Sequence, residues 1–234
     1  KPHEAAPGLP EYGDPWQYSS ATGSVAPQPA FSIGGSPDLQ QESGTTHISV
    51  VDKAGNMACA TPSGGAFDKS VFFSELGFAI STRSEMFNLT TGHPNCVAPG
   101  KRPRTTIINF MLAREDTPIT TIGCPGGDAQ AQANLQLLLN TVVWGMNPQE
   151  AVESPRFSSL SVPNSFYPHD YLAGQLALED TFPQSTLDAL ASMGHHVTCV
   201  ATCGMGGTVT TRNPTTGVFA TGADPRRSCY AIGW

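Results

Sequence analysis

The stretch that decides the fold, ESGTTHISVVDKAGN, occupies residues 42–56. Apolar and polar residues alternate from His47 to Asp52, which predicts a half-buried β-strand, and KAGN predicts a tight turn. MACAT then returns as the second strand of a hairpin. The hairpin opens at Gly44-Thr45-Thr46. Two threonines at a strand start are ordinary strand chemistry, but they also place a hydroxyl where it could be held for a reaction.

Composition restricts the partners of the chain. Its 234 residues suffice for one large domain or two small ones. Charged residues make up 13%, against about 25% in typical soluble domains, so the surface relies on uncharged polar groups. The net charge of −7 argues against nucleic acid as a partner. Because there is no apolar run of about 18 residues, no membrane span is expected.

Cysteine usage and one sequon predict a secreted protein. The even cysteine count, the low charge and Asn88-Leu89-Thr90 together favour an oxidising secretory route, with glycosylation at Asn88 and disulfides of undetermined pairing. Sequons and even counts also arise by chance. Neither the cysteines nor the histidines have convincing metal-ligand spacing, so no metal or organic cofactor is expected. The six cysteines are Cys59, Cys96, Cys124, Cys199, Cys203 and Cys229.

The order of elements predicts an α+β fold. Residues 1–44 are rich in Pro, Gly, Ser and Gln and predict an extended segment. Strands are expected at 76–82 and in a hairpin formed by 105–113 and 118–124, followed by a short helix from Pro148 and a helix over 183–195. The closing strands are expected at 195–200, 207–213 and 217–223. Strands, then helices, then strands indicate layers rather than a parallel doubly wound sheet.

A long helix is predicted over residues 126–145. Asp128 stands where an N-cap belongs, and Gly145 ends the pattern. The apolar positions that follow a helical period are Leu135, Leu138, Leu139, Val142 and Val143.

A threonine needs a base before it can act as a nucleophile. The threonine's own α-amino group can serve, since its pKa lies near 8, but only if the threonine is an N-terminus. Thr45 is internal, so this hypothesis requires cleavage of the Gly44–Thr45 bond.

Two further segments carry candidate chemistry. Gly126 and Gly127 precede the long helix, where backbone N–H groups can bind an oxyanion or simply form a tight turn. The loop APGKRPRTT, residues 98–106, holds the densest basic patch and ends in Thr105 and Thr106. This loop could bind a substrate carboxylate. The alternative is a solvated basic loop without a ligand. Asp224 and Arg226 are interpreted as an internal pair that fixes the C-terminal tail.

Six segments in one order resemble the γ-glutamyltransferase (γ-glutamyltranspeptidase) family. Together they cover nearly all of residues 44–234, so the resemblance is specific. They are TTHISVVDKAGN, APGKRPRTT, CPGGD, GMNPQEAVESPRF, ALASMGHHV and TGVFATGADPRR.

The resemblance implies an N-terminal nucleophile (Ntn) hydrolase fold, a four-layer αββα sandwich, in residues 45–234. Residues 1–44 then form the end of the large subunit, which becomes the partner of the catalytic small subunit after self-cleavage at Gly44–Thr45. Carried over by position, Thr45 is the nucleophile and Ser63 orients it. The resemblance also assigns the oxyanion hole to Gly126 and Gly127, and binding of the donor carboxylate to Thr105 and Thr106.

Two positions depart from the family pattern. Met86, in STRSEMF, stands where the family has an acidic residue that binds the substrate ammonium, and Gly65 replaces a pocket asparagine. Glu85 is the fallback partner for an ammonium, although a strand would point it the other way; Arg83 is the other substrate-binding candidate. TPSGG, STRSEMF and SFYPH resemble the γ-glutamyltransferase-like branch that is similar to acylases.

The sequence thus predicts a threonine amidohydrolase or acyltransferase that cleaves γ-glutamyl or related carboxyacyl amides, such as glutathione-type substrates, without a cofactor. Two alternatives stay open. One is an acylase on an amide other than γ-glutamyl, and the other is a silent, uncleaved protein of the same fold.

Overall fold

The computed structural model describes residues 44–64 and 70–234. The predicted extended segment up to residue 43, and Gly65, lie outside the described residues.

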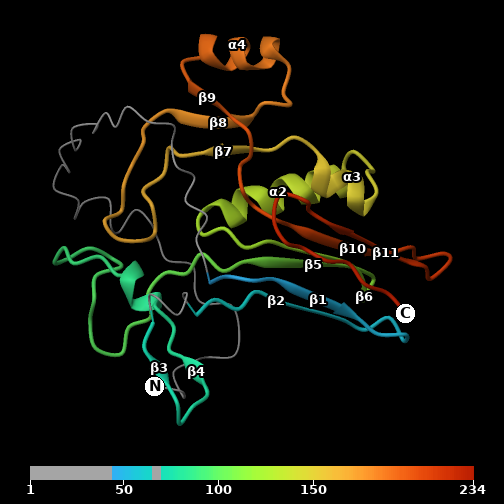
Figure 1. The fold of residues 1–234 in the computed structure, drawn as a ribbon, viewed down its shortest axis with the longest axis horizontal. Coiled ribbons are helices and arrows are strands. Elements are labelled where there is room, and N and C mark those ends of the chain that lie inside the picture. Colours follow the sequence, from blue (N-terminus) through green and yellow to red (C-terminus); the bar gives the residue numbers. More distant parts are fainter. Residues whose placement is uncertain (1–43, 65–69) are drawn as a thin grey trace.

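A four-stranded antiparallel sheet forms the centre of the molecule (Figure 1). Its order is β11-β10-β6-β5, with β5 at Asn109–Arg114, β6 at Thr117–Gly123, β10 at Thr208–Arg212 and β11 at Phe219–Ala223. The hairpin predicted at 105–124 is present as β5-β6, and the last two predicted strands pair as β10-β11. One face of the sheet packs an apolar core, whose fully buried members are Ile122, Leu137, Val152 and Val209.

Helices and a second strand pair lie on opposite faces of this sheet (Figure 1). The helices α2 (Ala129–Val142) and α3 (Pro148–Glu153) cover one face. The hairpin of β1 (Ile48–Val51) and β2 (Met57–Ala60) contacts β5 and β6 from the other side. These are three of the four layers of an αββα sandwich, in agreement with the predicted Ntn-hydrolase fold.

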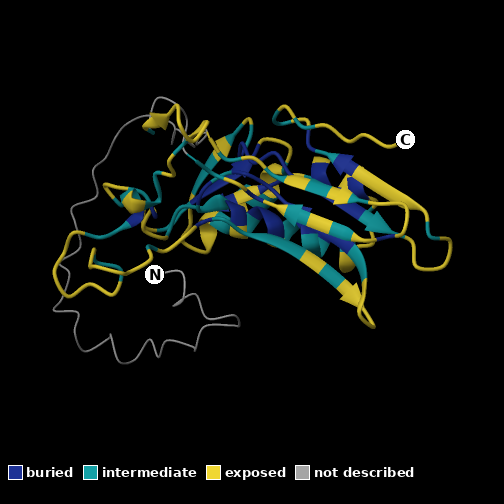
Figure 2. Cartoon of the chain, turned by 90° about the horizontal axis from the view of Figure 1, so that it is seen from below, coloured by how far each residue is buried: buried dark blue, intermediate teal, exposed yellow. Residues whose placement is uncertain are grey.

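A second, three-stranded sheet has the order β7-β8-β9. Here β7 is Phe157–Ser159, β8 is Gln175–Glu179 and β9 is His196–Val200. The chain passes from β8 through α4 (Gln184–Ser192) to β9, which is parallel to β8, and α4 packs against β9. Figure 2 shows that buried residues gather where strands and helices meet, whereas loops and the C-terminal tail are exposed.

The expected strand at residues 76–82 is much shorter in the structure. Only β4 (Phe78–Ala79) is extended, paired with β3 (Phe72–Phe73). The following segment is a 3-10 helix, Arg83–Met86, and not a strand. The prediction that strand geometry would direct Glu85 away from Met86 is therefore wrong. Glu85 instead accepts a hydrogen bond from the Thr82 hydroxyl at 3.3 Å.

Helix α2, at Ala129–Val142, lies within the predicted range 126–145 but is shorter, and it buries a different stripe. The predicted apolar positions Leu135, Val142 and Val143 are more than half exposed. The buried positions are Gln130, Ala133, Asn134, Leu137 and Asn140. Three of these are amides that bind backbone groups: Gln130 and Asn134 bind Ile108, and Asn140 binds the carbonyl of Ala151. The backbone groups of Ile108 and Ala151 need hydrogen-bond partners when buried. This need determines which face of α2 is turned inward.

The expected disulfides are not formed, because all six cysteines are free thiols. The sulfur of Cys59 accepts a hydrogen bond from Asn109, and those of Cys124 and Cys203 lie against backbone carbonyls. Burial raises the pKa of Cys124 to about 12, and that of Cys203 to about 12. Both are therefore unreactive thiols in the folded protein.

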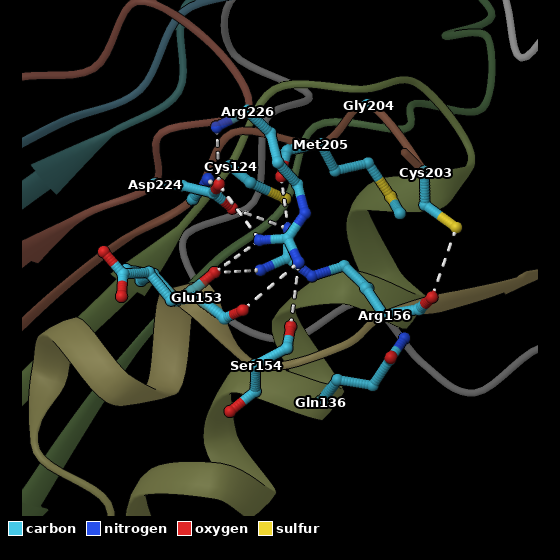
Figure 3. A network of polar contacts seen from close by, with 12 residues as sticks. Cys124, Gln136, Glu153, Ser154, Arg156, Cys203, Gly204, Met205, Asp224 and Arg226 are labelled. Carbon is cyan, nitrogen blue, oxygen red and sulfur yellow. Dashed lines mark hydrogen bonds and ion pairs between the residues drawn. The ribbon is translucent and has the colours of Figure 1, made fainter. Parts of the chain in front are cut away.

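Four charged side chains, three of them buried, join the two sheets. Figure 3 shows Arg156, Asp224 and Arg226 of this cluster. Arg156 pairs with Asp224 at 2.8 Å, and Arg226 pairs with Glu179 at 2.6 Å. Arg226 also contacts Asp224 at 3.1 Å, which confirms the internal pair predicted from the sequence. The side chains of Arg156, Glu179 and Asp224 are at most 3% exposed. Every charge in this cluster has a partner of opposite sign.

No helix in the described ranges is long and apolar enough to cross a lipid bilayer.

The cysteine environments predict graded alkylation of the native full-length protein. With iodoacetamide near pH 8, the exposed Cys199 should react at least about 100-fold faster than Cys124 and Cys203, whose thiolates are scarce. Peptide mass spectrometry after a time course measures this. A cysteine that becomes reactive only after treatment with a reductant would contradict the free-thiol assignment.

The ion cluster predicts a large cost for removing one charge. Asp224→Asn leaves the shape unchanged but deprives Arg156 of its carboxylate in a buried site, so the free energy of unfolding should fall by about 3–5 kcal/mol. Urea titration of the full-length protein measures it. Asp188→Asn, at an exposed position on α4, is the matched control and should change stability by less than about 0.5 kcal/mol. Equal effects of the two variants would refute the role of the cluster.

Candidate active site

Thr45 and Ser63 meet at the entrance to the β1-β2 hairpin. Their hydroxyl oxygens are 2.8 Å apart, and the two residues form an isolated antiparallel bridge. The adjacent N–H of Thr46 donates to the carbonyl of Pro62 at 3.1 Å, which fixes the register of the two chains. A hydrogen bond of this length positions the Thr45 hydroxyl and can share its proton.

The bond before Thr45 is held in a defined conformation. Gly44 has φ +100°, a region that favours glycine. Its carbonyl oxygen accepts a hydrogen bond from the N–H of Gly64 at 3.4 Å. The N–H therefore polarises the Gly44 carbonyl, the group next to the Thr45 hydroxyl in the chain.

Arg83 brings a positive charge to the same place. Its NH2 group donates to the Ser63 hydroxyl oxygen at 3.2 Å, and its guanidinium lies over the ring of Phe166, 5.3 Å from the centroid. Because Ser63 accepts from Arg83, its own hydroxyl proton is free to point at Thr45. Phe166 belongs to the segment SFYPH and was not expected at the site.

The turn before α2 has the geometry of an anion site. Gly126 has φ +131° and Gly127 has φ +53°. A Cβ on Gly126 would stand 3.1 Å from the Cγ of Met205, so a larger residue would also crowd that side chain. Within residues 44–64 and 70–234, neither glycine N–H has a hydrogen-bond acceptor. Both are available to an oxyanion.

His47 joins the segment of Thr45 to the end of β6. Its imidazole occupies the space that a Cβ on Gly123 would need, and its ring nitrogens contact the hydroxyls of Thr61 and Ser49 at 2.8 and 2.9 Å. Burial lowers the pKa of His47 from 6.5 to about 4, so the ring is neutral at pH 7. His47 was not among the predicted site residues, and the placement of a histidine in a hairpin strand was the one sequence signal for it.

Asp128 organises the other side of the site. It stands at the N-cap position of α2, as predicted, but its side chain makes no capping bond. It accepts hydrogen bonds from the N–H and hydroxyl of Ser165, and it lies 3.5 Å from Arg104. Ser165 precedes Phe166, so a continuous set of contacts runs from Thr45 to the residue after Gly127.

The remaining predicted substrate residues lie near this set but do not touch Thr45. Thr106 is buried, and Thr105 is exposed with its hydroxyl accepting from the N–H of Ile107. Asn95 links the end of their loop to the 3-10 helix: it accepts from the N–H of Arg104 and donates to the carbonyl of Met86. Glu85 points to Thr82 and not to the nucleophile position.

Asn88 is half-buried, and its side-chain oxygen accepts from the N–H of Thr90 at 2.7 Å. Glycosylation there stays a prediction. In the part of the chain that the structure describes, no three His, Cys, Asp or Glu side chains are grouped so as to hold a metal ion.

The layered fold, with the paired hydroxyls of Thr45 and Ser63 just before the β1-β2 hairpin, is that of the Ntn hydrolases. A family model described as gamma-glutamyltranspeptidase matches residues 14–234. The chain therefore belongs to the γ-glutamyltranspeptidase family.

Relatives of two activities resemble the chain. It is 30% identical over 189 residues to the glutathione hydrolase proenzyme of Bacillus subtilis subsp. natto, covering 80% of this chain and 29% of that protein. A mutant of Helicobacter pylori gamma-glutamyltranspeptidase superposes with TM-score 0.64 at 25% identity, covering 78% of this chain and 100% of the other. Cephalosporin acylase from Bacillus halodurans superposes with TM-score 0.59 at 34% identity, covering 68% and 28%. The chain thus spans less than a third of the curated relative.

The pKa of His47 predicts a loss of stability in acid. The unfolded imidazole binds a proton below about pH 6.5, whereas the folded one stays neutral down to about 4. Its contribution is complete above pH 6.5 and is lost as pH falls toward 4. Because the ring is partly exposed, we expect about 1–2 kcal/mol.

Urea titrations of the full-length protein at several pH values between about 7 and 4 measure this loss. His47→Gln removes the titrating group and should flatten the pH dependence in this window, whereas the exposed His195→Gln should leave it as in the parent. A His47→Gln profile parallel to the parent profile would contradict the assignment.

Proposed function

We propose that the chain is the catalytic part of a threonine amidohydrolase or acyltransferase, matured by cleavage between Gly44 and Thr45. The observation that carries the proposal is the 2.8 Å contact between the Thr45 and Ser63 hydroxyls, with Arg83 donating to Ser63. This geometry supplies a positioned hydroxyl at the residue that would become an N-terminus.

Maturation follows from the groups around Gly44. The Thr45 oxygen attacks the Gly44 carbonyl carbon, while the N–H of Gly64 stabilises the developing negative charge on the carbonyl oxygen. The C–N bond breaks, the Thr45 nitrogen takes up the hydroxyl proton, and an ester links Gly44 to the Thr45 oxygen. Water then hydrolyses the ester, leaving a carboxylate on Gly44 and a free amine on Thr45.

The mature site can repeat this chemistry on an external amide. The α-amine of Thr45 accepts the hydroxyl proton as the oxygen attacks the acyl carbon, and it returns the proton to the leaving amine. The free N–H groups of Gly126 and Gly127 are proposed to stabilise the oxyanion. Water or an acceptor amine releases the acyl group from the ester. No cofactor takes part in these steps.

The partner is proposed to be the remainder of the same precursor, the large subunit. Ile48 and Val50 are more than half exposed on the outer face of the β1-β2 hairpin, and the exposed end of α2 adds Val142, Val143 and Trp144. Apolar surface of this kind is typical of an interface. We further propose that the protein is secreted, because of its sequon and low charge.

Two acyl groups are candidates for the amide that the protein cleaves. Glutathione-type γ-glutamyl amides are one candidate, since the Bacillus relative is named a glutathione hydrolase proenzyme. An amide of another carboxylic acid is the second candidate, and the buried, apolar Met86 beside Arg83 favours it.

Cleavage before Thr45 is tested by mass spectrometry of the purified full-length protein. We expect a fragment that begins at Thr45. Thr45→Ala should stay uncleaved and lose amide hydrolysis by at least about 1,000-fold, because the attacking oxygen is gone. Thr46→Ala, at the exposed neighbouring threonine, is the matched control and should mature and turn over amides like the parent.

If the parent protein hydrolyses amides while its chain stays intact through Thr45, the proposed mechanism is wrong. An intact chain without any hydrolysis would support a silent protein of the same fold. Cleavage of Thr45→Ala at the same bond would show that another group or a protease performs the maturation.

A further inference from the structure

Among the described residues, the guanidinium of Arg83 has no anionic partner. Its polar contacts there are the Ser63 hydroxyl at 3.2 Å and the sulfur of Met86 at 3.9 Å, and it lies over the ring of Phe166. Its Nε–H is buried and has no hydrogen-bond partner. A buried donor without an acceptor costs free energy unless a ligand satisfies it.

Two described carboxylates close to this set of contacts, those of Glu85 and Asp128, have other partners. Glu85 accepts from the Thr82 hydroxyl, and Asp128 is shared between Ser165 and Arg104. Met86, which is fully buried, adds no charge. Arg83 therefore supplies one positive charge, and the described residues in contact with it supply a hydroxyl, a thioether and an aromatic ring.

We propose that Arg83 selects acyl groups that carry a carboxylate and no ammonium, so that the preferred substrates are monoamides of short dicarboxylic acids. This inference rests on the proposed function and deepens it. A carboxylate can accept from the free Nε–H and a neighbouring N–H of the guanidinium in a bidentate pair. An ammonium on the same acyl chain would be repelled by the guanidinium and would find no carboxylate there.

The position of Arg83 also limits the length of the acyl chain. Only the Ser63 hydroxyl separates its guanidinium from the Thr45 oxygen. A carboxylate bound by Arg83 must therefore lie a few carbons from the acyl carbon that Thr45 attacks. A glutaryl group meets this requirement.

Three p-nitroanilides that differ by one group each test the proposal on the mature full-length protein. Valeryl anilide is the neutral reference, glutaryl anilide adds the carboxylate, and γ-glutamyl anilide adds an ammonium to the glutaryl group. We expect kcat/KM for glutaryl anilide to exceed both others by at least about tenfold. An equal or faster reaction of the γ-glutamyl anilide would overturn the proposal.

Arg83→Gln should reduce the ratio of glutaryl to valeryl turnover by at least about tenfold, because it removes the charge. The ratio is the measured quantity, since the contact with Ser63 can change both rates together. Arg114→Gln, an exposed arginine at the end of β5, is the control and should leave the ratio unchanged. An unchanged ratio in Arg83→Gln would refute the role of Arg83.

A binding measurement on the parent protein tests the selectivity of Arg83 without relying on turnover or on any variant. Calorimetry of the parent protein with glutarate and with L-glutamate should give tighter binding of glutarate by at least about tenfold. If no anilide reacts and Thr45 stays uncleaved, the proposed function fails, yet preferential glutarate binding would still support the selectivity of Arg83. Equal binding, or preference for glutamate, would overturn it.

Discussion

The pairing of buried charges is the constraint on which the rest of the structure depends. Arg156 and Asp224 are almost fully removed from water, and each is stable only because the other is present. Arg226 extends the pair to Glu179, at the end of β8 in the second sheet. The backbone between the sheets is tied in as well, since Arg156 donates to the carbonyls of Met205 and Val152 (Figure 3). The two sheets are therefore joined through electrostatic contacts.

This junction supports the site from behind. The loop that contains Met205 is held by Arg156 at one carbonyl and by Glu179, which accepts from the N–H of Cys203. Met205 in turn packs against Gly126, in the turn whose N–H groups have no acceptor among the described residues. Because glycine adopts many backbone conformations, this packing restricts the conformation of the turn. The buried charges thus act at a distance on the direction of the proposed oxyanion donors.

A second set of polar contacts, weaker than the buried ion pairs, lies around Thr45. Single hydrogen bonds and one cation–π contact connect Thr45 through Ser63 and Arg83 to Phe166. Asp128 fixes the segment of Phe166 by binding Ser165. Bonds of this kind contribute about 0.5–1.5 kcal/mol each. The contacts from Thr45 to Phe166 can therefore rearrange around a ligand more easily than the buried ion cluster. The proposed nucleophile and the proposed acyl-binding cation lie together in this second set of contacts.

The hairpins, the positions of the helices along the chain, the family and the Asp224–Arg226 pair follow from the sequence, because these depend on local periodicity, turn residues and motif order. The inward face of α2, the side-chain partner of Asp128 and the structure of the segment of Glu85 could not be predicted from it. There, side chains met distant groups: amides met the backbone of Ile108, and a carboxylate met Ser165. Only the tertiary structure decides such pairings, since a buried polar group takes whichever partner the fold brings within reach.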